Sequence, residues 1–300
     1  MKIVISGLGK MGKQIAKKLH ENNHDVFTHN RSIEAINEMK DFGINGSQDK
    51  SSVITFFGSD MVILWIMIPQ DALDNEIKEW IKVLPKGSII IDGGNSDFRI
   101  TRDRGKKLAS LGYSFIDIGT SGGIWGYKNG FSMMIGGEKE VFQKIEPIIE
   151  ALSKPNGGYQ YFGESGSGHF VKMVHNAIEY GMMQSLAEGF HLLKEGPYKI
   201  DLALAGDVWQ SGSVIASWLN GLMAEGLKEN PELKGIEGIV AESGEAKWAL
   251  ETAKEYNIPM PSISSSFDVR IKSQSGRVNF ATKLLALTRN AFGGHKINNK

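Results

Sequence analysis

The stretch "KIVISGLGKMG", from Lys2 to Gly12, decides the fold. A short apolar run leads into Gly7, Gly9 and Gly12 at G-x-G-x-x-G spacing, and an amphipathic segment follows. The first glycine allows a tight turn, the second lets a pyrophosphate approach the backbone, and the third lets a helix pack closely on a strand. The amides at the start of that helix then face the anion. Such a motif is weak alone, but its place between a strand and a helix predicts a dinucleotide site.

The alternation of short apolar runs with amphipathic segments continues from this loop. The expected strands are 2–9, 25–32, 61–69, 87–96 and 113–123. The expected helices are 10–24, 33–43, 72–84 and 101–112. Strands that alternate with helices in this way predict a parallel sheet covered on both faces.

The alternation ends at a glycine-rich segment, "NGGYQYFGESGSG", at 156–168. Clustered glycines of this kind mark a boundary. The strand pattern then stops, and the expected helices are 168–195, 201–223, 236–257 and 264–291. The fold class is therefore α/β followed by all-α, with a Rossmann-type doubly wound domain at 1–165 and a helical substrate and dimerisation domain at 166–300.

Composition excludes several classes of protein. Lys+Arg and Asp+Glu are both 34, so the formal net charge is zero, which argues against general nucleic-acid or membrane binding. The chain has no cysteine, which fits a reducing cytoplasm. The oiliest run, 61–69, is shorter than the roughly 20 residues that span a bilayer. The apolar stretch at the amino terminus is too short for a signal peptide, so we expect a cytoplasmic protein.

The end of the second strand carries the signal for cofactor choice. An acidic residue there accepts the ribose hydroxyls of NAD, whereas a cation holds the phosphate of NADP. The sequence is "HNRS", so Arg31 favours NADP, with NAD possible, although a solvated loop arginine is common. The full set of expected cofactor residues is Gly7, Leu8, Gly9, Lys10, Met11, Gly12, Asn30, Arg31, Ser32, Ile66, Met67, Ile68 and Asn95.

An unusual polar stripe lies on the helix expected at 168–195. Each helical residue advances by roughly 100°. The other faces of this helix are apolar. One face therefore holds five polar side chains, which are Lys172, His175, Asn176, Glu179 and Tyr180. Such a stripe is either a solvated face or the lining of a wet cavity. Because it follows the domain boundary, where a cleft is expected, we interpret Lys172 and Glu179 as a base and an acid.

Several motifs together resemble 6-phosphogluconate dehydrogenase. They are "IIIDGGNS" (89–96), "TSGGIWGYKNGFSMMIGG" (120–137), "GSGHFVKMVHNAIEYGMMQ" (166–184) and "RNAFGGH" (289–295). The resemblance runs from Gly7 to His295, and the length suggests the short bacterial type. It implies oxidative decarboxylation of 6-phosphogluconate to ribulose 5-phosphate and CO2 with reduction of NADP or NAD, in the pentose phosphate pathway and gluconate use.

The resemblance also implies roles for particular residues. Lys172 would be the general base in the oxidation and would polarise the ketone during loss of CO2, and Glu179 would protonate carbon 1. No metal is implied, and the histidines show no ligand pairing such as H-E-x-x-H. The implied substrate contacts are Asn95, Ser121, Gly122, Gly123, His175, Asn176, Tyr180, Arg270, Arg289 and His295.

The resemblance further implies a homodimer, or a dimer of dimers, because Arg289 and His295 correspond to residues that the second subunit supplies in the long enzymes. Two departures concern the substrate phosphate: Ser243 and Glu245 stand where the long enzymes have a lysine and a threonine. Lys247 or Arg277 could bind the substrate phosphate in their place. Ile124 replaces an acidic residue after the SGG turn.

Two other functions share this pattern. A 3-hydroxyacid dehydrogenase of the 3-hydroxyisobutyrate type has the glycine loop, the SGG turn and the lysine, but it oxidises without a dedicated acid. A non-catalytic NADP sensor could use the same scaffold. Glu179 argues against both, because neither a plain dehydrogenase nor a sensor needs an acid beside the lysine.

Overall fold

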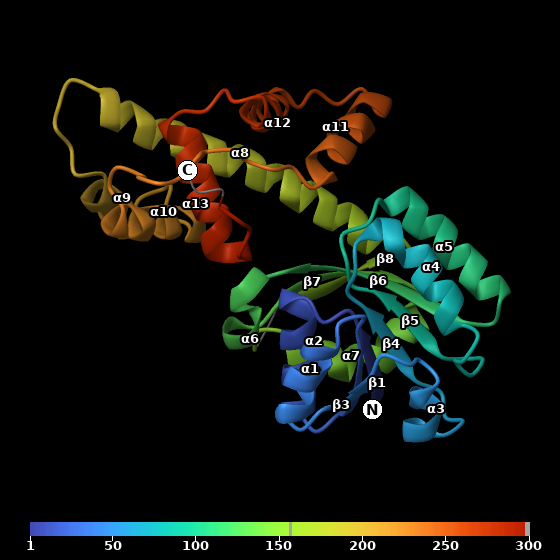
Figure 1. Cartoon of the computed structure of the whole chain (residues 1–300). Helices are drawn as coiled ribbons and strands as arrows, with labels where there is room; N and C mark the ends of the chain where they lie inside the picture. The colour runs from blue at the N-terminus through green and yellow to red at the C-terminus, as the bar shows by residue number, and fades with distance from the viewer. Residues whose placement is uncertain (156–157, 298–300) are drawn as a thin grey trace. The chain divides into compact units, whose positions relative to one another are not determined.

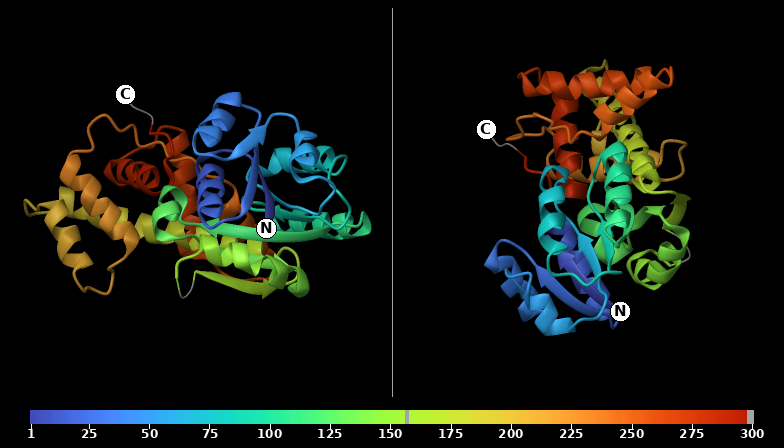
Figure 2. Two further views of the ribbon diagram at one scale, coloured as in Figure 1. Left: turned by 90° about the horizontal axis from the view of Figure 1, so that it is seen from below. Right: turned by 90° about the vertical axis from the view of Figure 1, so that its right-hand side faces the viewer.

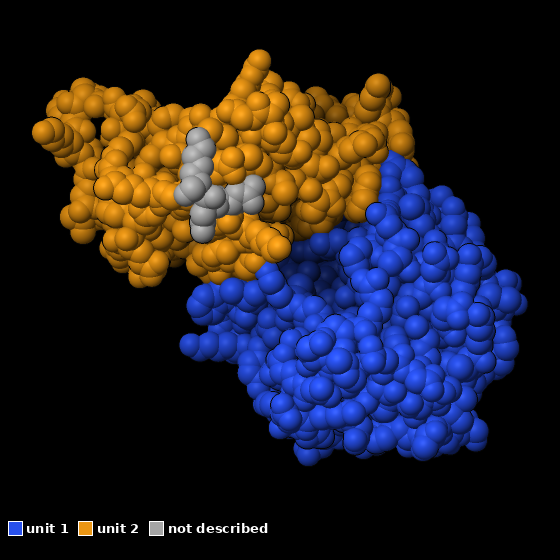
Figure 3. Space-filling model, in the orientation of Figure 1, with its two compact units in different colours: residues 1–173 blue, residues 174–300 orange. Residues whose placement is uncertain are grey.

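The computed structural model describes residues 1–155 and 158–297. The chain divides into two compact units, Met1–Met173 and Val174–Lys300 (Figures 1 and 3). The glycine-rich segment expected at the boundary starts at Asn156 and Gly157, which lie outside the described residues. No helix among the described residues is long and apolar enough to cross a membrane.

The first unit is built on an eight-stranded sheet with strand order β3-β2-β1-β4-β5-β6-β7-β8 (Figures 1 and 2). The strands are β1 (Lys2–Ser6), β2 (Asp25–His29), β3 (Asn45–Ser47), β4 (Ile63–Ile66), β5 (Ile89–Asp92), β6 (Ser114–Ser121), β7 (Ser132–Gly137) and β8 (Tyr159–Gly163). The strand order reverses between β1 and β4, which is the topological switch point where ligands of such sheets bind. The expected doubly wound domain is confirmed.

Alternating side chains along the strands fill two cores, one on each face of the sheet. Ile3 and Ile5 of β1 belong to one core, and Val4 belongs to the other. The first core is closed by α1 (Lys10–Glu21), α2 (Ile33–Asp41) and α7 (Lys139–Leu152). The second is closed by α3 (Ser52–Phe57), α4 (Gln70–Trp80) and α5 (Phe98–Ser110). Apolar periodicity therefore determines which helix covers which face.

The sheet departs from the prediction at its far edge. β7 runs antiparallel to β6, and the connection between them holds the short helices η1 (Gly123–Trp125) and α6 (Gly126–Asn129). The sequence pattern did not predict β7 or β8, nor β3, which has only three residues. β8 lies within the glycine-rich segment, where its alternating "YQYFG" is hidden among turn residues. Antiparallel strands need no crossover helix between them, so the alternation of strands with helices did not predict β7.

The second unit is helical, as expected, but its helices are shorter than predicted. The helix α8 (Ser167–Glu195) begins in the first unit and continues into the second, which then holds α9 (Leu202–Gln210), α10 (Trp218–Glu229), α11 (Glu245–Glu255), α12 (Pro261–Gln274) and α13 (Phe280–Gly293). α10 packs against α9 and α13. A core that includes Met183, Phe190 and Leu284 joins these helices.

Three of the predicted helices were wrong in extent. The helix expected at 201–223 is interrupted after Gln210, where Gly212 has a φ of 107° and Ser217 caps the next helix. The helix expected at 236–257 begins only at Glu245, after Gly244 with a φ of 100°. The helix expected at 264–291 is divided between α12 and α13, where Asn279 forms a capping box. Left-handed glycines and caps stop a helix even when its apolar period continues.

Candidate active site

The glycine loop has the geometry that a dinucleotide requires. Gly7 has a φ of 100°, and a Cβ there would lie 2.5 Å from the carbonyl oxygen of Met67. A Cβ on Gly12 would overlap the Gly7 carbonyl oxygen, whereas one on Gly9 would meet nothing within 4 Å. Gly9 is the N-cap of α1, so the first amides of that helix face the open side of the turn. These residues fit a bound pyrophosphate.

The loop after β2 is organised by Asn30. Its Oδ1 accepts a hydrogen bond from the backbone N–H of Leu8 at 3.1 Å, and its Nδ2 donates to the carbonyl of Ser32 at 3.2 Å. Ser32 caps α2 and donates from its hydroxyl to Glu34 at 2.5 Å. Arg31 is exposed beside them. Asn30 therefore shapes the turn, and Arg31 is an exposed cation next to it.

The expected cofactor residues divide by where their side chains point. Those of Leu8 and Ile66 are buried in the core, so only their backbone atoms can face a ligand. Met67 and Ile68 are partly exposed and lie directly against Gly7. Lys10 is exposed at the start of α1. The structure thus brings the ends of β1, β2 and β4 together around the loop, as parallel strands require.

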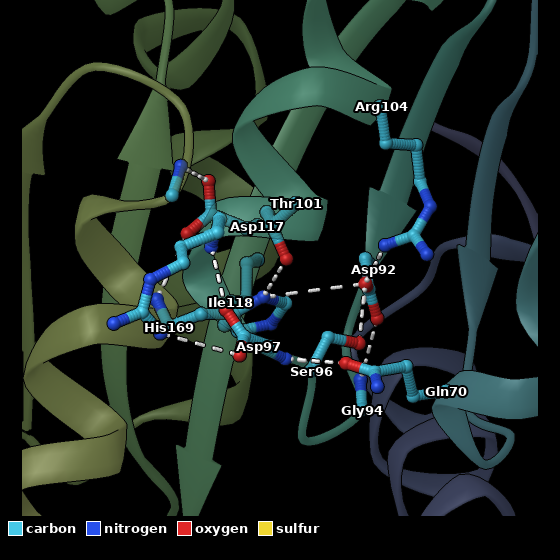
Figure 4. Close-up of polar contacts among 12 residues, drawn as sticks. Gln70, Asp92, Gly94, Ser96, Asp97, Thr101, Arg104, Asp117, Ile118 and His169 are labelled. Carbon is cyan, nitrogen blue, oxygen red and sulfur yellow. Dashed lines mark hydrogen bonds and ion pairs between the residues drawn. The ribbon is translucent and has the colours of Figure 1, made fainter. Parts of the chain in front are cut away.

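A buried polar network holds the turn after β5 (Figure 4). Asp92, at the end of β5, accepts hydrogen bonds from the Gly94 N–H at 3.1 Å and from the Ser96 hydroxyl at 2.9 Å. Arg104 Nη1 donates to the same carboxylate at 3.1 Å, and its Nε donates to Asp74 at 2.8 Å. The carboxylate therefore fixes the turn, and it leaves Asn95 exposed.

A second carboxylate fixes the start of α8. Asp117, on β6, accepts hydrogen bonds from the backbone N–H groups of Gly166 at 2.7 Å and His169 at 2.9 Å. Burial raises the pKa of Asp117, although the charge of His169 and these two hydrogen bonds oppose the shift. The His169 ring shares a hydrogen bond of 2.8 Å with the hydroxyl of Thr101, and its Nδ1 lies 4.0 Å from Asp92 (Figure 4).

Sequence analysis missed these supporting residues. Asp92 and His169 lie inside the motifs at 89–96 and 166–184, next to residues with expected roles. Burial provides the missing signal: Asp92, Asp117 and His169 are each at most 1% exposed. Charged groups are seldom fully buried without partners, so the burial of these three side chains indicates a structural hydrogen-bond network.

Lys172 lies in close contact with β6. It is 6% exposed, and its side chain packs directly over Gly119, which precedes the SGG turn by two residues. Ser121 ends β6, and Gly122 and Gly123 turn the chain with φ values of 128° and 53°. The first unit therefore brings the expected base close to the strand that carries the expected substrate turn.

The polar face of α8 continues in the second unit as a chain of hydrogen bonds. His175 Nδ1 and Asn176 Oδ1 are 2.9 Å apart, and Asn176 Nδ2 donates to Glu245 Oε1 at 3.0 Å. Tyr180 is buried, and its hydroxyl accepts a hydrogen bond from the Ser243 N–H at 3.4 Å. The apolar side chains of α8 are not all buried, because Ile178 and Met182 are 49% and 45% exposed.

Two buried arginines complete this part of the second unit. The guanidinium of Arg270 lies 3.2 Å from the centroid of the Tyr180 ring, a cation–π contact. Burial lowers the pKa of Arg270 to about 10, with Tyr180 opposing and Arg289 adding to the shift. Burial also lowers the pKa of Arg289, while Tyr180, Glu179 and Glu245 oppose that shift. Arg289 therefore lies among side chains of its own chain.

The other expected phosphate contacts are not in this group. His295 is exposed, and its carbonyl accepts a hydrogen bond from Asn290 Nδ2 at 2.7 Å. Lys247 is exposed and lies 4.0 Å from Glu251, and Arg277 is exposed as well. Of the cations named for the substrate phosphate, only Arg270 and Arg289 are buried in the described part of the chain.

The fold and its first turn define a class of protein. An open, mostly parallel sheet with a glycine loop at its switch point is a dinucleotide-binding domain, here joined to a helical unit. Residues 2–164 match the family model for the NAD binding domain of 6-phosphogluconate dehydrogenase, and residues 168–299 match the model for its C-terminal domain. The chain belongs to the 6-phosphogluconate dehydrogenase family of oxidoreductases, with NADP or NAD as cofactor.

Individual relatives agree with this assignment. An NAD(+)-dependent, decarboxylating 6-phosphogluconate dehydrogenase of Haloferax volcanii is 33% identical over 302 residues, covering 100% of this chain and 99% of the relative. The solved 6-phosphogluconate dehydrogenase of Plasmodium falciparum has a TM-score of 0.83 at 28% identity, covering 99% of this chain and 66% of that one. A 3-hydroxyisobutyrate dehydrogenase of Salmonella typhimurium, at 16% identity and a TM-score of 0.77, shares the fold over 95% of this chain and 99% of its own.

Proposed function

We propose that this protein converts 6-phosphogluconate to ribulose 5-phosphate and CO2 while reducing NADP or NAD, as part of the pentose phosphate pathway. The observation that carries the proposal is the polar face of α8. One continuous helix bears Lys172, His175, Asn176, Glu179 and Tyr180, and its start is anchored by the buried carboxylate of Asp117. A base and an acid two turns apart on one helix suit a reaction that removes one proton and later adds another.

The chemistry assigns a role to each end of this face. The bound dinucleotide supplies the hydride acceptor. Lys172 Nζ takes the proton of the 3-hydroxyl as hydride leaves carbon 3. The resulting 3-keto acid loses its carboxyl group as CO2, and the electron pair of the broken bond moves onto the ketone oxygen, which the protonated Lys172 hydrogen-bonds. Glu179 then delivers a proton to carbon 1 of the resulting enediolate, which restores the ketone.

The remaining expected residues would hold the substrate. We assign the sugar hydroxyls and carboxylate to Asn95, Ser121, Gly122, Gly123, His175, Asn176 and Tyr180. We assign the phosphate to Arg270 and Arg289, because both guanidiniums are buried in one group of side chains, and such sites bind phosphate strongly. His295 is kept as a further contact from the carboxyl-terminal tail. In functional terms residues 1–165 would form the dinucleotide-binding domain, which also carries Asn95 and the SGG turn, and residues 166–300 would form the helical substrate and dimerisation domain.

Cofactor preference and assembly complete the proposal. Arg31, exposed at the end of β2, supports NADP over NAD. A homodimer, or a dimer of dimers, is supported by apolar side chains of α8 that are exposed in the single chain, among them Ile178 at 49% and Met182 at 45%. Contiguous exposed apolar surface of this kind marks interaction sites.

The test is an absorbance assay of reduced nicotinamide with 6-phosphogluconate, run with NAD and with NADP while released CO2 is measured. We expect one CO2 for each reduced cofactor. Reduction of the cofactor without CO2, or turnover of 3-hydroxyisobutyrate alone, would instead establish a simple 3-hydroxyacid dehydrogenase. Binding of cofactor with no turnover of either substrate would indicate a sensor.

A further inference from the structure

A hydrogen-bonded chain of three side chains, half-buried at two of them and fully buried at the third, reaches from α8 to the first residue of α11. Its members are His175, Asn176 and Glu245, and the two contacts measure 2.9 Å and 3.0 Å. Glu245 is 2% exposed, and its Oε2 has no hydrogen-bond partner among the described residues. Asn176 is thus the only described donor to the side chain of Glu245.

The chemistry of the carboxylate gives this chain a direction. An ionised carboxylate can only accept hydrogen bonds, so the Asn176 side chain must present its NH2 group to Glu245. Its carbonyl oxygen then faces His175 Nδ1. A carbonyl oxygen can only accept, so the proton of the neutral imidazole must be on Nδ1. The reversed amide is excluded, because it would set the amide oxygen against the carboxylate, two acceptors with no proton between them.

We propose that Glu245 is a positioning residue that sets the tautomer of His175. With the proton held on Nδ1, the lone pair of the neutral ring is on Nε2, and that nitrogen becomes an acceptor for a hydroxyl group. The chain therefore makes His175 an acceptor for a polyol substrate. The importance of this for catalysis rests on the proposed function, whereas the tautomer itself does not.

The position of Glu245 in the fold supports this role. It is the first residue of α11, where the amides of the helix end stabilise a negative charge. Arg289 is close enough for the charge of Glu245 to oppose the lowering of its pKa. The helix end and the guanidinium of Arg289 are the kind of compensation that a buried negative charge needs.

The first test is the tautomer of His175 in the full-length, ligand-free enzyme. Two-bond proton–nitrogen correlation spectra of ¹⁵N-histidine-labelled protein, recorded at pH about 8.5, where an ordinary histidine is neutral, distinguish the two forms. A His175→Gln variant identifies the signal. We expect the Nδ1–H form. Observation of the Nε2–H form, which free histidine prefers, would overturn the proposal without any mutation of Glu245.

The second test removes the acceptor. In Glu245→Leu, which keeps most of the side-chain volume, we expect the signal of His175 to shift toward the Nε2–H form. Glu242→Gln is the matched control, because Glu242 is a neighbouring carboxylate that accepts from the Gly244 N–H rather than from Asn176. It should leave the tautomer unchanged. A His175 signal that is the same in Glu245→Leu and in wild type would contradict the proposal.

The third test asks whether Glu245 acts through His175. We expect Glu245→Leu to lower kcat/KM for 6-phosphogluconate by about 10-fold, the effect of losing one hydrogen bond to a charged group. The same change in a His175→Gln background should cost little, because the two residues act as one unit. Full additivity of the two losses would refute the coupling. If the wild-type enzyme has no activity on this substrate, the proposed function fails, and the spectra still decide the tautomer.

Discussion

Gly119→Ala tests how closely the catalytic geometry depends on β6. A Cβ at position 119 would lie 2.7 Å from Cγ of Lys172, closer still to its Cβ, and 3.2 Å from the carbonyl oxygen of Gly168. Rotation of the Lys172 side chain cannot relieve the overlap, because the backbone alone determines the position of a Cβ atom. Either α8 or β6 must therefore move.

The start of α8 has little freedom to move. Asp117 holds it through two backbone hydrogen bonds, and a Cβ on Gly168 would lie 2.5 Å from the carbonyl oxygen of Met134, so the helix already touches the backbone of the sheet. An ordinary contact needs at least 3.4 Å, so Lys172 must shift by roughly 1 Å. Overpacking of this kind costs about 1–3 kcal/mol of folding free energy.

The expected result is a loss of about 100-fold in kcat/KM for 6-phosphogluconate, because a displacement of about 1 Å in an active site has that effect. The melting temperature should fall by about 2–4 °C for each kcal/mol lost. Cofactor affinity, measured by fluorescence titration, should stay near the wild-type value, because the glycine loop follows β1 and not β6. Gly189→Ala, on the same helix with nothing within 4 Å, is the matched control and should keep full activity. A folded Gly119→Ala enzyme with near-normal turnover would refute this reasoning.

The remaining predictions concern three side chains. Lys172→Ala should lower kcat by about 100-fold or more, the effect of losing a general base, whereas Lys78→Ala, an exposed lysine of α4, should not; equal kinetics in both variants would exclude Lys172 as the base. Arg31→Asp should lower the ratio of kcat/KM for NADP to that for NAD by about 10-fold or more, because a cation is replaced by an anion next to the added phosphate, and an unchanged ratio would remove Arg31 from the cofactor site. Burial, and then the charge of Lys50, lower the pKa of His29 below its ordinary value of about 6.5. As the pH falls below about 6.5, His29 therefore binds a proton in the unfolded state more readily than in the folded state. The free energy of unfolding should fall over this range. Urea titrations of wild type and His29→Gln from pH about 7 to about 5 check this, and parallel pH profiles would contradict it.

Local pattern determined much of this protein. The glycine loop follows an apolar strand and opens a helix, so "KIVISGLGKMG" identified the dinucleotide domain without any distant contact. The 3.6-residue period likewise predicted that Lys172, Asn176 and Glu179 share a face, and α8 is helical over the expected residues. Both signals lie within one or two consecutive elements, where covalent geometry decides which side chains are neighbours.

Tertiary structure decided what depends on partners far apart in the chain. β7 pairs antiparallel with β6, and the apolar period of the last three predicted helices gave no sign of the glycines and caps that shorten or divide them. Gly119 contacts Lys172, and Arg104 pairs with Asp92. Glu245 binds Asn176, which lies 69 positions earlier in the chain. Periodicity predicts which face of an element is buried but not which residue of another element meets it. That pairing is determined by the packing of whole strands and helices against one another.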